Sequence, residues 1–388
     1  MYNVREITDN LYWVGANDHR THLFENIHPI PQGVSYNAYV LLDKETVLFD
    51  TVDWSAYRQF EENLEHVLDG RPLDWIVINH LEPDHAASIE QILKKYPNVK
   101  IISTEKGYLL MRQFGFHPDE HECIEVTEGD THTFGDHTIA VLTAPMVHWP
   151  EVMVTLDVTN GALFSADAFG KFGALDVEED WTCEARRYYF GIVGKYGVQA
   201  QALLKKAAGL DIQTICALHG PILKENLGYY LDLYNTWSSY GVESEGVVIA
   251  YTSVYGNTKK AVELLADKLT ALGCPKVTVT DLARDDMAEA VEDAFRYGKL
   301  VLATTTYNGD IFPFMKTFIE HLTERGYRNR TIGLIENGSW APTAAKTMLK
   351  MFEGSKNLTF TDTTVTIKSA VNTENETQIA ALAEELCK

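Results

Sequence analysis

The chain has 388 residues, 45% of them hydrophobic and 11% aromatic, and its 33 basic and 55 acidic residues give a formal net charge of −22. This length is more than one typical hydrophobic core fills, and it predicts two domains. The acidic balance argues against nucleic acid or an anionic membrane as a partner, because both attract basic surfaces.

The N-terminal residues and the cysteines indicate the compartment. The first seven residues lack a positively charged start followed by an apolar stretch, and no apolar run approaches the ~18 residues of a membrane span. The cysteines form no C-x-x-C pair, which argues against a zinc ribbon and a rubredoxin-type iron site. They are Cys123, Cys183, Cys216, Cys274 and Cys387. An odd, scattered set is typical of reduced thiols, so we expect a cytoplasmic protein.

The first half of the chain predicts two β-rich layers flanked by helices. Apolar or alternating runs separated by turn residues indicate a strand meander at 11–14, 37–42 and 47–50. A helix is expected at 57–68 and a strand at 75–78. A second sheet is expected from 99–103, 139–143 and a hairpin of 152–158 with 162–165, followed by helices near 184–208 and 227–240. The expected fold is an αββα sandwich.

The densest group of potential metal ligands directly follows the run at 75–78. His80-Leu81-Glu82-Pro83-Asp84-His85 holds two imidazoles and two carboxylates. Apolar positions at helical spacing after His85 place Asp84 and His85 at a helix N-terminus, which turns both the same way. His148, Asp167 and His219 also follow apolar runs. Solvated loop residues would explain any one of these side chains, but seven at strand ends suffice for two metals.

The second half alternates strictly between strands and helices. Strands are expected at 247–251, 277–280, 300–304, 331–335 and 358–367, and helices at 259–272, 287–297, 314–324, 344–352 and 373–386. Five strands each followed by a helix predict a doubly wound parallel sheet of flavodoxin type. A polar, glycine-bounded stretch near 241–246 separates the halves, and we place the domains at 1–243 and 246–388.

Three loops at the expected carboxyl ends of these strands predict a cofactor site. The first offers hydroxyls and free amides for a phosphate, with no basic residue before Lys259, although a lone turn of this kind could be a plain helix cap. The loops are Thr252, Ser253, Val254, Tyr255, Gly256, Asn257 and Thr258; Thr305, Thr306, Tyr307, Asn308 and Gly309; and Asn337, Gly338, Ser339 and Trp340. Together they resemble the FMN site of flavodoxins. The lack of G-x-G-x-x-G and of a Walker lysine argues against a dinucleotide or a nucleoside triphosphate.

The ligand motif is similar to that of the metallo-β-lactamase fold, whose zinc hydrolases usually carry His where this chain has Glu82. With Glu82 and the second domain, the whole chain resembles the flavodiiron proteins. The resemblance implies one iron at His80, Glu82 and His148, another at Asp84, His85 and His219, and a bridging Asp167. Some members replace the ligand at His80 with water. Three carboxylates make a hard donor set that suits iron, while the ligands alone leave zinc or manganese open.

The resemblance also implies a function. A flavin and two irons store up to four electrons, enough to reduce O2 to two waters, and reduction of two NO to N2O consumes two. We therefore expect an oxygen reductase, a nitric oxide reductase or both. The chain ends after the second domain, which resembles the two-domain class that takes electrons from a separate rubredoxin-like carrier. Family members form head-to-tail dimers, so a homodimer or a dimer of dimers is expected.

Two other functions stay open at this stage. One is a zinc hydrolase of metallo-β-lactamase fold with an accessory flavodoxin, and the other is an electron carrier with an inactive first domain. No catalytic residue beyond the metal ligands is predicted. Tyr188, Tyr189 and Tyr196 fit either core packing or a hydrogen bond to an iron-bound oxygen, and His19, His22 and His28 are expected not to be ligands. Candidates for docking an acidic carrier are Arg186, Arg187, Lys195, Lys205 and Lys206.

Overall fold

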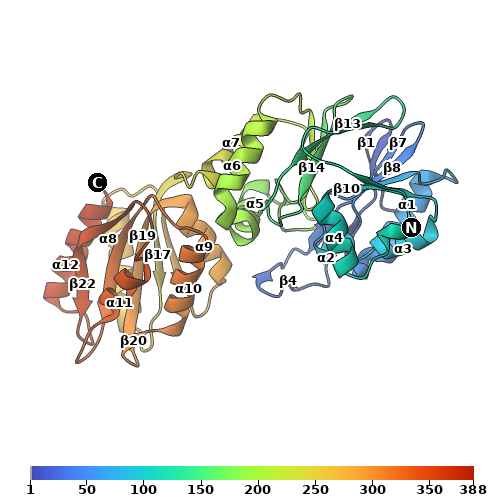
Figure 1. Ribbon diagram of the computed structural model, residues 1–388. Helices are drawn as coiled ribbons and strands as arrows, with labels where there is room; N and C mark the ends of the chain where they lie inside the picture. The colour runs from blue at the N-terminus through green and yellow to red at the C-terminus, as the bar shows by residue number, and fades with distance from the viewer. Residues whose placement is uncertain (1) are drawn as a thin grey trace. The chain divides into compact units, whose positions relative to one another are not determined.

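The computed structural model describes residues 2–388, which form two compact units (Figure 1). The first extends to Asn235, and the second is Thr236–Lys388. Within the described chain, no helix is both long and apolar enough to cross a membrane.

Two sheets stacked face to face make up the first unit. The larger runs in the order β1 (Arg5–Thr8), β2 (Leu11–Trp13), β7 (Tyr39–Leu42), β8 (Thr46–Phe49), β9 (Trp75–Val77), β10 (Lys100–Ser103) and β11 (Cys123–Glu125). The smaller runs β12 (Thr131–Thr133), β13 (Thr138–Thr143), β14 (Met153–Asp157), β15 (Ala162–Phe164) and β16 (Thr214–Cys216). Their inner faces share one apolar core, in which the rings of Phe49 and Phe164 stack at 3.7 Å.

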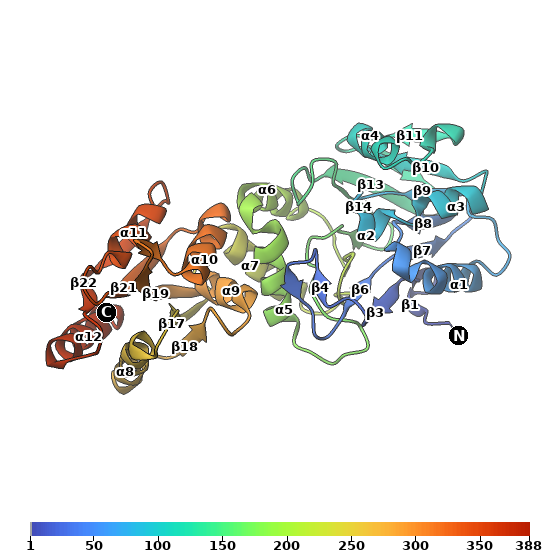
Figure 2. The same ribbon diagram turned by 90° about the horizontal axis from the view of Figure 1, so that it is seen from below.

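Helices flank the sheets, as expected for an αββα sandwich (Figure 2). They are α1 (Tyr57–Leu68), α2 (Pro83–Ala86), α3 (Ile89–Lys95), α4 (Glu105–Gln113), α5 (Trp181–Tyr188), α6 (Gly197–Ala207) and α7 (Leu227–Ser238). Two small ribbons precede β7: β3 (Ala16–Asp18) with β6 (Val34–Tyr36), and β4 (Leu23–Phe24) with β5 (His28–Pro29).

Three details of the first unit differ from the sequence prediction. The strand expected at 99–103 is β10, which lies parallel to β9 in the larger sheet rather than in the second one. The helices between β9 and β10 bring the chain back so that β10 lies next to β9, and the hydrophobic pattern of the sequence does not indicate which strands pair. The helix expected after His85 is two short helices, α2 and α3. The helix expected at 184–208 is broken between α5 and α6 by a π-helical turn, Tyr189–Val193, and a 3-10 turn.

The second unit is a parallel sheet in the order β18 (Val277–Asp281), β17 (Ser244–Tyr251), β19 (Tyr297–Tyr307), β21 (Arg330–Asn337) and β22 (Leu358–Ile367), with β20 (Asp310–Ile311) paired to β19. This 2-1-3-4-5 order is that of flavodoxin and confirms the expected doubly wound sheet. Its helices are α8 (Asn257–Ala271), α9 (Met287–Arg296), α10 (Pro313–Glu324), α11 (Ala344–Met351) and α12 (Thr373–Leu386).

The first and second units meet in sequence within α7, whose last turn clusters with the second unit. The residues Ser244–Gly246, expected to belong to a linker, already form the start of β17. The domain limits 1–243 and 246–388 remain a prediction about where each function ends.

Candidate functional site

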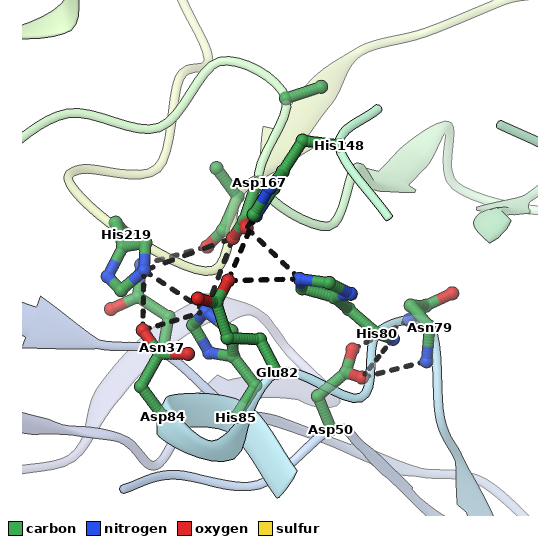
Figure 3. A network of polar contacts seen from close by, with 12 residues as sticks. Asn37, Asp50, Asn79, His80, Glu82, Asp84, His85, His148, Asp167 and His219 are labelled. Atoms are coloured by element: carbon green, nitrogen blue, oxygen red, sulfur yellow. Dashed lines mark hydrogen bonds and ion pairs between the residues drawn. The ribbon is translucent and has the colours of Figure 1, made fainter. Parts of the chain in front are cut away.

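A buried carboxylate fixes the turn that leads from β9 to the first predicted ligand. Asp50 accepts hydrogen bonds from the backbone N of Asn79 at 2.7 Å and from its side-chain amide at 2.7 Å, and from the backbone N of His80 at 3.3 Å (Figure 3). Pro83 then begins α2, so Asp84 and His85 lie in its single turn. The motif is therefore held by backbone contacts rather than by a free loop.

All seven predicted ligands converge. They fall into two groups, and within each group the ligand atoms all lie within 4.8 Å of one another. The first group is His80, Glu82, His148 and Asp167, and the second is Asp84, His85 and His219. They come from the loops that follow β9, β13, β15 and β16 and from the start of α2, whose N-cap is Glu82.

Asp167 lies between the two groups (Figure 3). Its Oδ2 is 3.0 Å from His148 Nε2 and 3.4 Å from His80 Nε2. Its Oδ1 is 3.2 Å from His85 Nε2 and 3.9 Å from His219 Nε2. Each oxygen thus faces a different pair of imidazoles, which is the arrangement that a carboxylate shared between two metals requires.

The second group shows most directly that the donors suit a cation. His219 Nδ1 donates to the carbonyl oxygen of Ser35 at 2.7 Å, which leaves Nε2 as an acceptor, and this atom is 3.0 Å from His85 Nε2 and 3.2 Å from Asp84 Oδ2. Both oxygens of Asp84 and Oδ1 of Asp167 are buried without a hydrogen-bond donor. Buried carboxylates are costly unless a positive charge compensates them, so this donor set fits bound metal ions.

The charges of these groups shift one another's protonation. Burial opposes protonation of His148, but hydrogen bonds to Asp167 and Glu82 outweigh it and raise its pKa to about 9. The same holds for His80: burial would lower its pKa, but the charge of Asp167 outweighs burial and raises the pKa of His80 well above its usual range. Burial would raise the pKa of Asp167, but the imidazoles of His80 and His85 hold it well below its usual range. A metal would therefore displace protons from the imidazoles.

Aromatic rings enclose the second group. Phe24, Tyr36 and Tyr188 lie 5.2, 5.9 and 5.5 Å from the ring of His219. The hydroxyl of Tyr188 is buried and has no hydrogen-bond partner. Burial and the nearby charges of Asp167, Asp84 and Glu82 raise its pKa well above the usual range. Of the three tyrosines left open above, Tyr188 thus lies beside the ligands.

Sequence reasoning missed two carboxylates beside the cluster. Glu25 follows β4 in a left-handed conformation (φ 48°). Desolvation and the charge of Glu82 raise the pKa of Glu25 to about 7, although the residue is exposed overall. Glu151 is buried beside His80. Neither could be found from local pattern, since Glu25 sits in a polar turn and Glu151 looks like any residue between strands.

The other histidines expected not to be ligands lie outside both groups. His19 pairs with Asp176 at 2.9 Å, and His28 packs against the ring of Phe172. The basic docking candidates need correction: Arg186 and Arg187 are buried, because α5 turns them inward, and therefore cannot form a surface patch. Lys206 is bound to Glu128 at 2.7 Å.

The predicted cofactor loops line one hollow of about 640 Å³ in the second unit. Of the predicted residues, two do not line it: Thr252 is buried beneath it, with its hydroxyl 2.6 Å from that of Thr304, and Gly256 makes the left-handed turn into α8. The hollow is also lined by three residues that were not predicted: Ala341, Thr343 and Ser369. Ser369 follows β22, so the strand-end rule could have found it.

Comparison with known proteins matches both units. Residues 34–220 match the family model of ODP family β-lactamases, and residues 248–366 match that of a flavodoxin domain. The anaerobic nitric oxide reductase flavorubredoxin of Salmonella typhi is 27% identical over 348 residues, which are 86% of this chain and 72% of that protein.

Solved structures match the fold over almost the whole chain. Rubredoxin oxygen:oxidoreductase from Desulfovibrio gigas has a TM-score of 0.92 and 24% identity, covering 99% of this chain and 98% of that one. The flavodiiron protein of Giardia intestinalis has a TM-score of 0.92 and 21% identity, covering 100% and 97%. With both domain models matched in this order, the chain belongs to the flavodiiron family, with a β-lactamase-like domain followed by a flavodoxin domain.

Proposed function

We propose that this protein is an oxidoreductase that reduces O2 to water, NO to N2O, or both, at a pair of irons, with electrons that reach them through FMN from an external rubredoxin-like carrier. The proposal assigns the irons to residues 1–243 and the flavin to residues 246–388. The names of the similar proteins, a nitric oxide reductase and a rubredoxin:oxygen oxidoreductase, support this chemistry.

One observation carries the proposal. Asp167 presents its two oxygens to two different pairs of imidazoles, in a chain that also holds a flavodoxin hollow. A lone metal needs no such bridge, whereas a two-metal site is built around one. The oxygen-rich donor set favours iron over zinc.

The ligand assignment follows the two groups. One iron would be held by His80, Glu82 and His148, the other by Asp84, His85 and His219, and Asp167 would be shared. When bound, the irons and the flavin supply the electrons and the site at which a diatomic gas is reduced. The rings around His219 keep bulk water from this side of the cluster. The unpartnered hydroxyl of Tyr188 is placed to donate a hydrogen bond there.

The flavin would be held without charged side chains. The N-terminus of α8 and the hydroxyls of Ser253 and Thr258 suit a phosphate, and Tyr255 and Trp340 offer exposed aromatic faces to a ring. The head-to-tail homodimer and the cytoplasmic location expected above remain parts of this proposal. Sedimentation of the loaded protein would test the first of them.

The test uses the full chain reconstituted anaerobically with Fe(II) and FMN. We expect two irons and one flavin per chain, and rapid consumption of O2 or NO once a reduced rubredoxin is supplied. Running the gases separately ranks them. A protein that retains zinc, hydrolyses an ester or lactam and leaves both gases untouched would instead support the hydrolase, an alternative that the comparisons do not favour.

A further inference from the structure

We propose that Glu151 is a positioning residue that orients the imidazole of His80 and thereby makes His80 a ligand of the first iron. The inference rests on the proposed function, because it presumes that irons occupy the two groups of ligands. It concerns the one ligand position at which the family resemblance left a choice between imidazole and water.

The contacts of one carboxylate oxygen carry the argument. Glu151 Oε1 accepts a hydrogen bond from His80 Nδ1 at 2.8 Å and another from the backbone N of Leu81 at 3.0 Å. The side chains of His80 and Glu151 are both fully buried. A carboxylate only accepts, so Nδ1 carries a hydrogen whatever the charge of the ring, and Nε2 is the nitrogen left to bind a metal once its own proton is displaced. That Nε2 lies 3.4 Å from Glu82 Oε2 and 3.4 Å from Asp167 Oδ2, on the side of the ligands.

The segment around Glu151 is itself well anchored. Its backbone carbonyl accepts a hydrogen bond from the hydroxyl of Thr104 at 3.1 Å, which ties the segment to the start of α4. The ring of Trp149 meets that of His80 edge-on, with centroids 5.4 Å apart. One short segment therefore supplies a ligand, His148, and holds a second one from two directions.

The other imidazoles of the cluster are held differently. His219 Nδ1 donates to a neutral backbone carbonyl, and His85 Nδ1 is buried without a hydrogen-bond partner. A carboxylate partner makes an imidazole a stronger donor to a metal than a carbonyl does. The second oxygen of Glu151, Oε2, is buried and has no hydrogen-bond partner. The positive charge that a metal places on the His80 ring would compensate this carboxylate, so the two stabilise each other.

The experiment is a double-mutant cycle in the full-length protein, with the variants Glu151→Ala, Glu151→Gln, His80→Ala and the pair Glu151→Ala with His80→Ala. Fe(II) affinity is measured anaerobically by chelator competition, and Mössbauer spectra of the ⁵⁷Fe-loaded protein distinguish the two irons. Circular dichroism and a thermal melt of the metal-free protein report that the first unit of each variant is folded, and flavin content reports the same for the second unit. Glu128→Gln, on the exposed surface of the same unit, is the matched control.

We expect Glu151→Ala to lower the affinity for one iron by about 10- to 100-fold and to change one of the two Mössbauer components. The affinity for the other iron and the flavin content should stay unchanged. Glu151→Gln should recover part of the affinity, because its amide oxygen can still accept from Nδ1. In the His80→Ala background, removal of Glu151 should change the affinity less than about twofold, because its partner is gone.

Two results would overturn the inference while leaving the proposed function in place. One is wild-type affinity and spectra in both Glu151 variants. The other is an equal loss in the His80→Ala background, which would mean that Glu151 acts on packing rather than through His80. A wild-type chain that binds no iron pair would instead overturn the proposed function, and this inference with it. If Glu151→Ala is misfolded in the thermal melt, the cycle built with Glu151→Gln decides.

Discussion

The metal centre and the flavin hollow are built in opposite ways. At the metal centre, His80, His85, Asp167 and His219 are at most 1% exposed, and hydrogen bonds from Nδ1 hold the rings of His80 and His219. In the flavin hollow, Tyr255 and Trp340 are 92% and 93% exposed. A small ion offers little surface against which its ligands can be buried, so the protein itself has to position the ligands before the ion binds. A flavin brings a large apolar face that buries the loops on binding.

Backbone conformation shows the same contrast. Next to the metal ligands, Met146 and Ala166 have φ values of 66° and 50°, which strain any residue with a side chain. In the three predicted flavin loops, the left-handed positions are Gly256, Asn308 and Gly309, residue types that tolerate them, and only Ser369, which lines the hollow from outside these loops, departs from this pattern with φ 74°. The remainder of the fold must therefore stabilise the metal centre, whereas the flavin loops adopt their shape at little cost.

The largest expected effect is on the bridge between the two groups. Asp167→Asn keeps the shape but removes the charge that both groups share, so iron affinity should fall by more than about 100-fold, with loss of gas reduction. Flavin content should stay at the wild-type level. The matched control is Asp157→Asn, another buried aspartate of the same unit, which pairs with His137. Full iron loading of the Asp167 variant would contradict the bridge.

A backbone change should empty the flavin hollow alone. A Cβ at Gly338 would lie 2.6 Å from the Cα of Pro342, so Gly338→Ala must displace the third loop. We expect about 10-fold weaker FMN binding, the effect of roughly 1.4 kcal/mol, and unchanged iron. Fluorescence titration of the flavin measures this. At Gly298 a Cβ would make only ordinary contacts, at 3.4 Å or more, so Gly298→Ala is the control. Loss of iron in the Gly338 variant would show that the two sites are not independent.

Proton competition should give the metal centre a pH dependence that the flavin hollow lacks. The pKa of His148 is raised to about 9, so its charge stabilises the metal-free fold fully below about pH 6.5 and this contribution is lost as pH rises through 9. Iron affinity should move the other way, increasing by at least about tenfold per pH unit between roughly pH 6.5 and 8.5, because His148 releases one proton and the raised pKa of His80 adds to the slope. Chemical denaturation of the metal-free protein and chelator competition measure the two trends. A flat affinity would argue against His148 as a ligand.

The smallest expected effect concerns the ring beside the cluster. Tyr188→Phe removes only a buried hydroxyl without a hydrogen-bond partner, so stability should change by less than about 1 kcal/mol, in either direction. If that hydroxyl donates to the bound gas, turnover should fall by up to about tenfold, the loss of one hydrogen bond. Stopped-flow oxidation of the reduced protein measures turnover. The comparison variant is Tyr234→Phe, because the hydroxyl of Tyr234 accepts a hydrogen bond from the backbone N of Phe169. Unchanged turnover would assign Tyr188 to core packing.

Much of both sites could be predicted from local pattern. The proposed metal ligands lie just after apolar runs, and each proposed flavin loop follows a strand of an alternating series. The carboxyl ends of strands and the starts of helices are where side chains and amides become available to ligands. The same pattern predicted the αββα sandwich and the doubly wound sheet, which the structure and the matched families confirm.

Tertiary structure alone decided the rest. The sheet to which β10 belongs, the burial of Arg186 and Arg187, and the approach of Glu25 and Glu151 to the ligands all depend on which distant segments pair. So does the position of Asp167 between two pairs of imidazoles. Hydrophobic periodicity indicates only whether a residue faces inward. It does not indicate which distant side chain that residue will contact. That choice is made by packing the whole core at once.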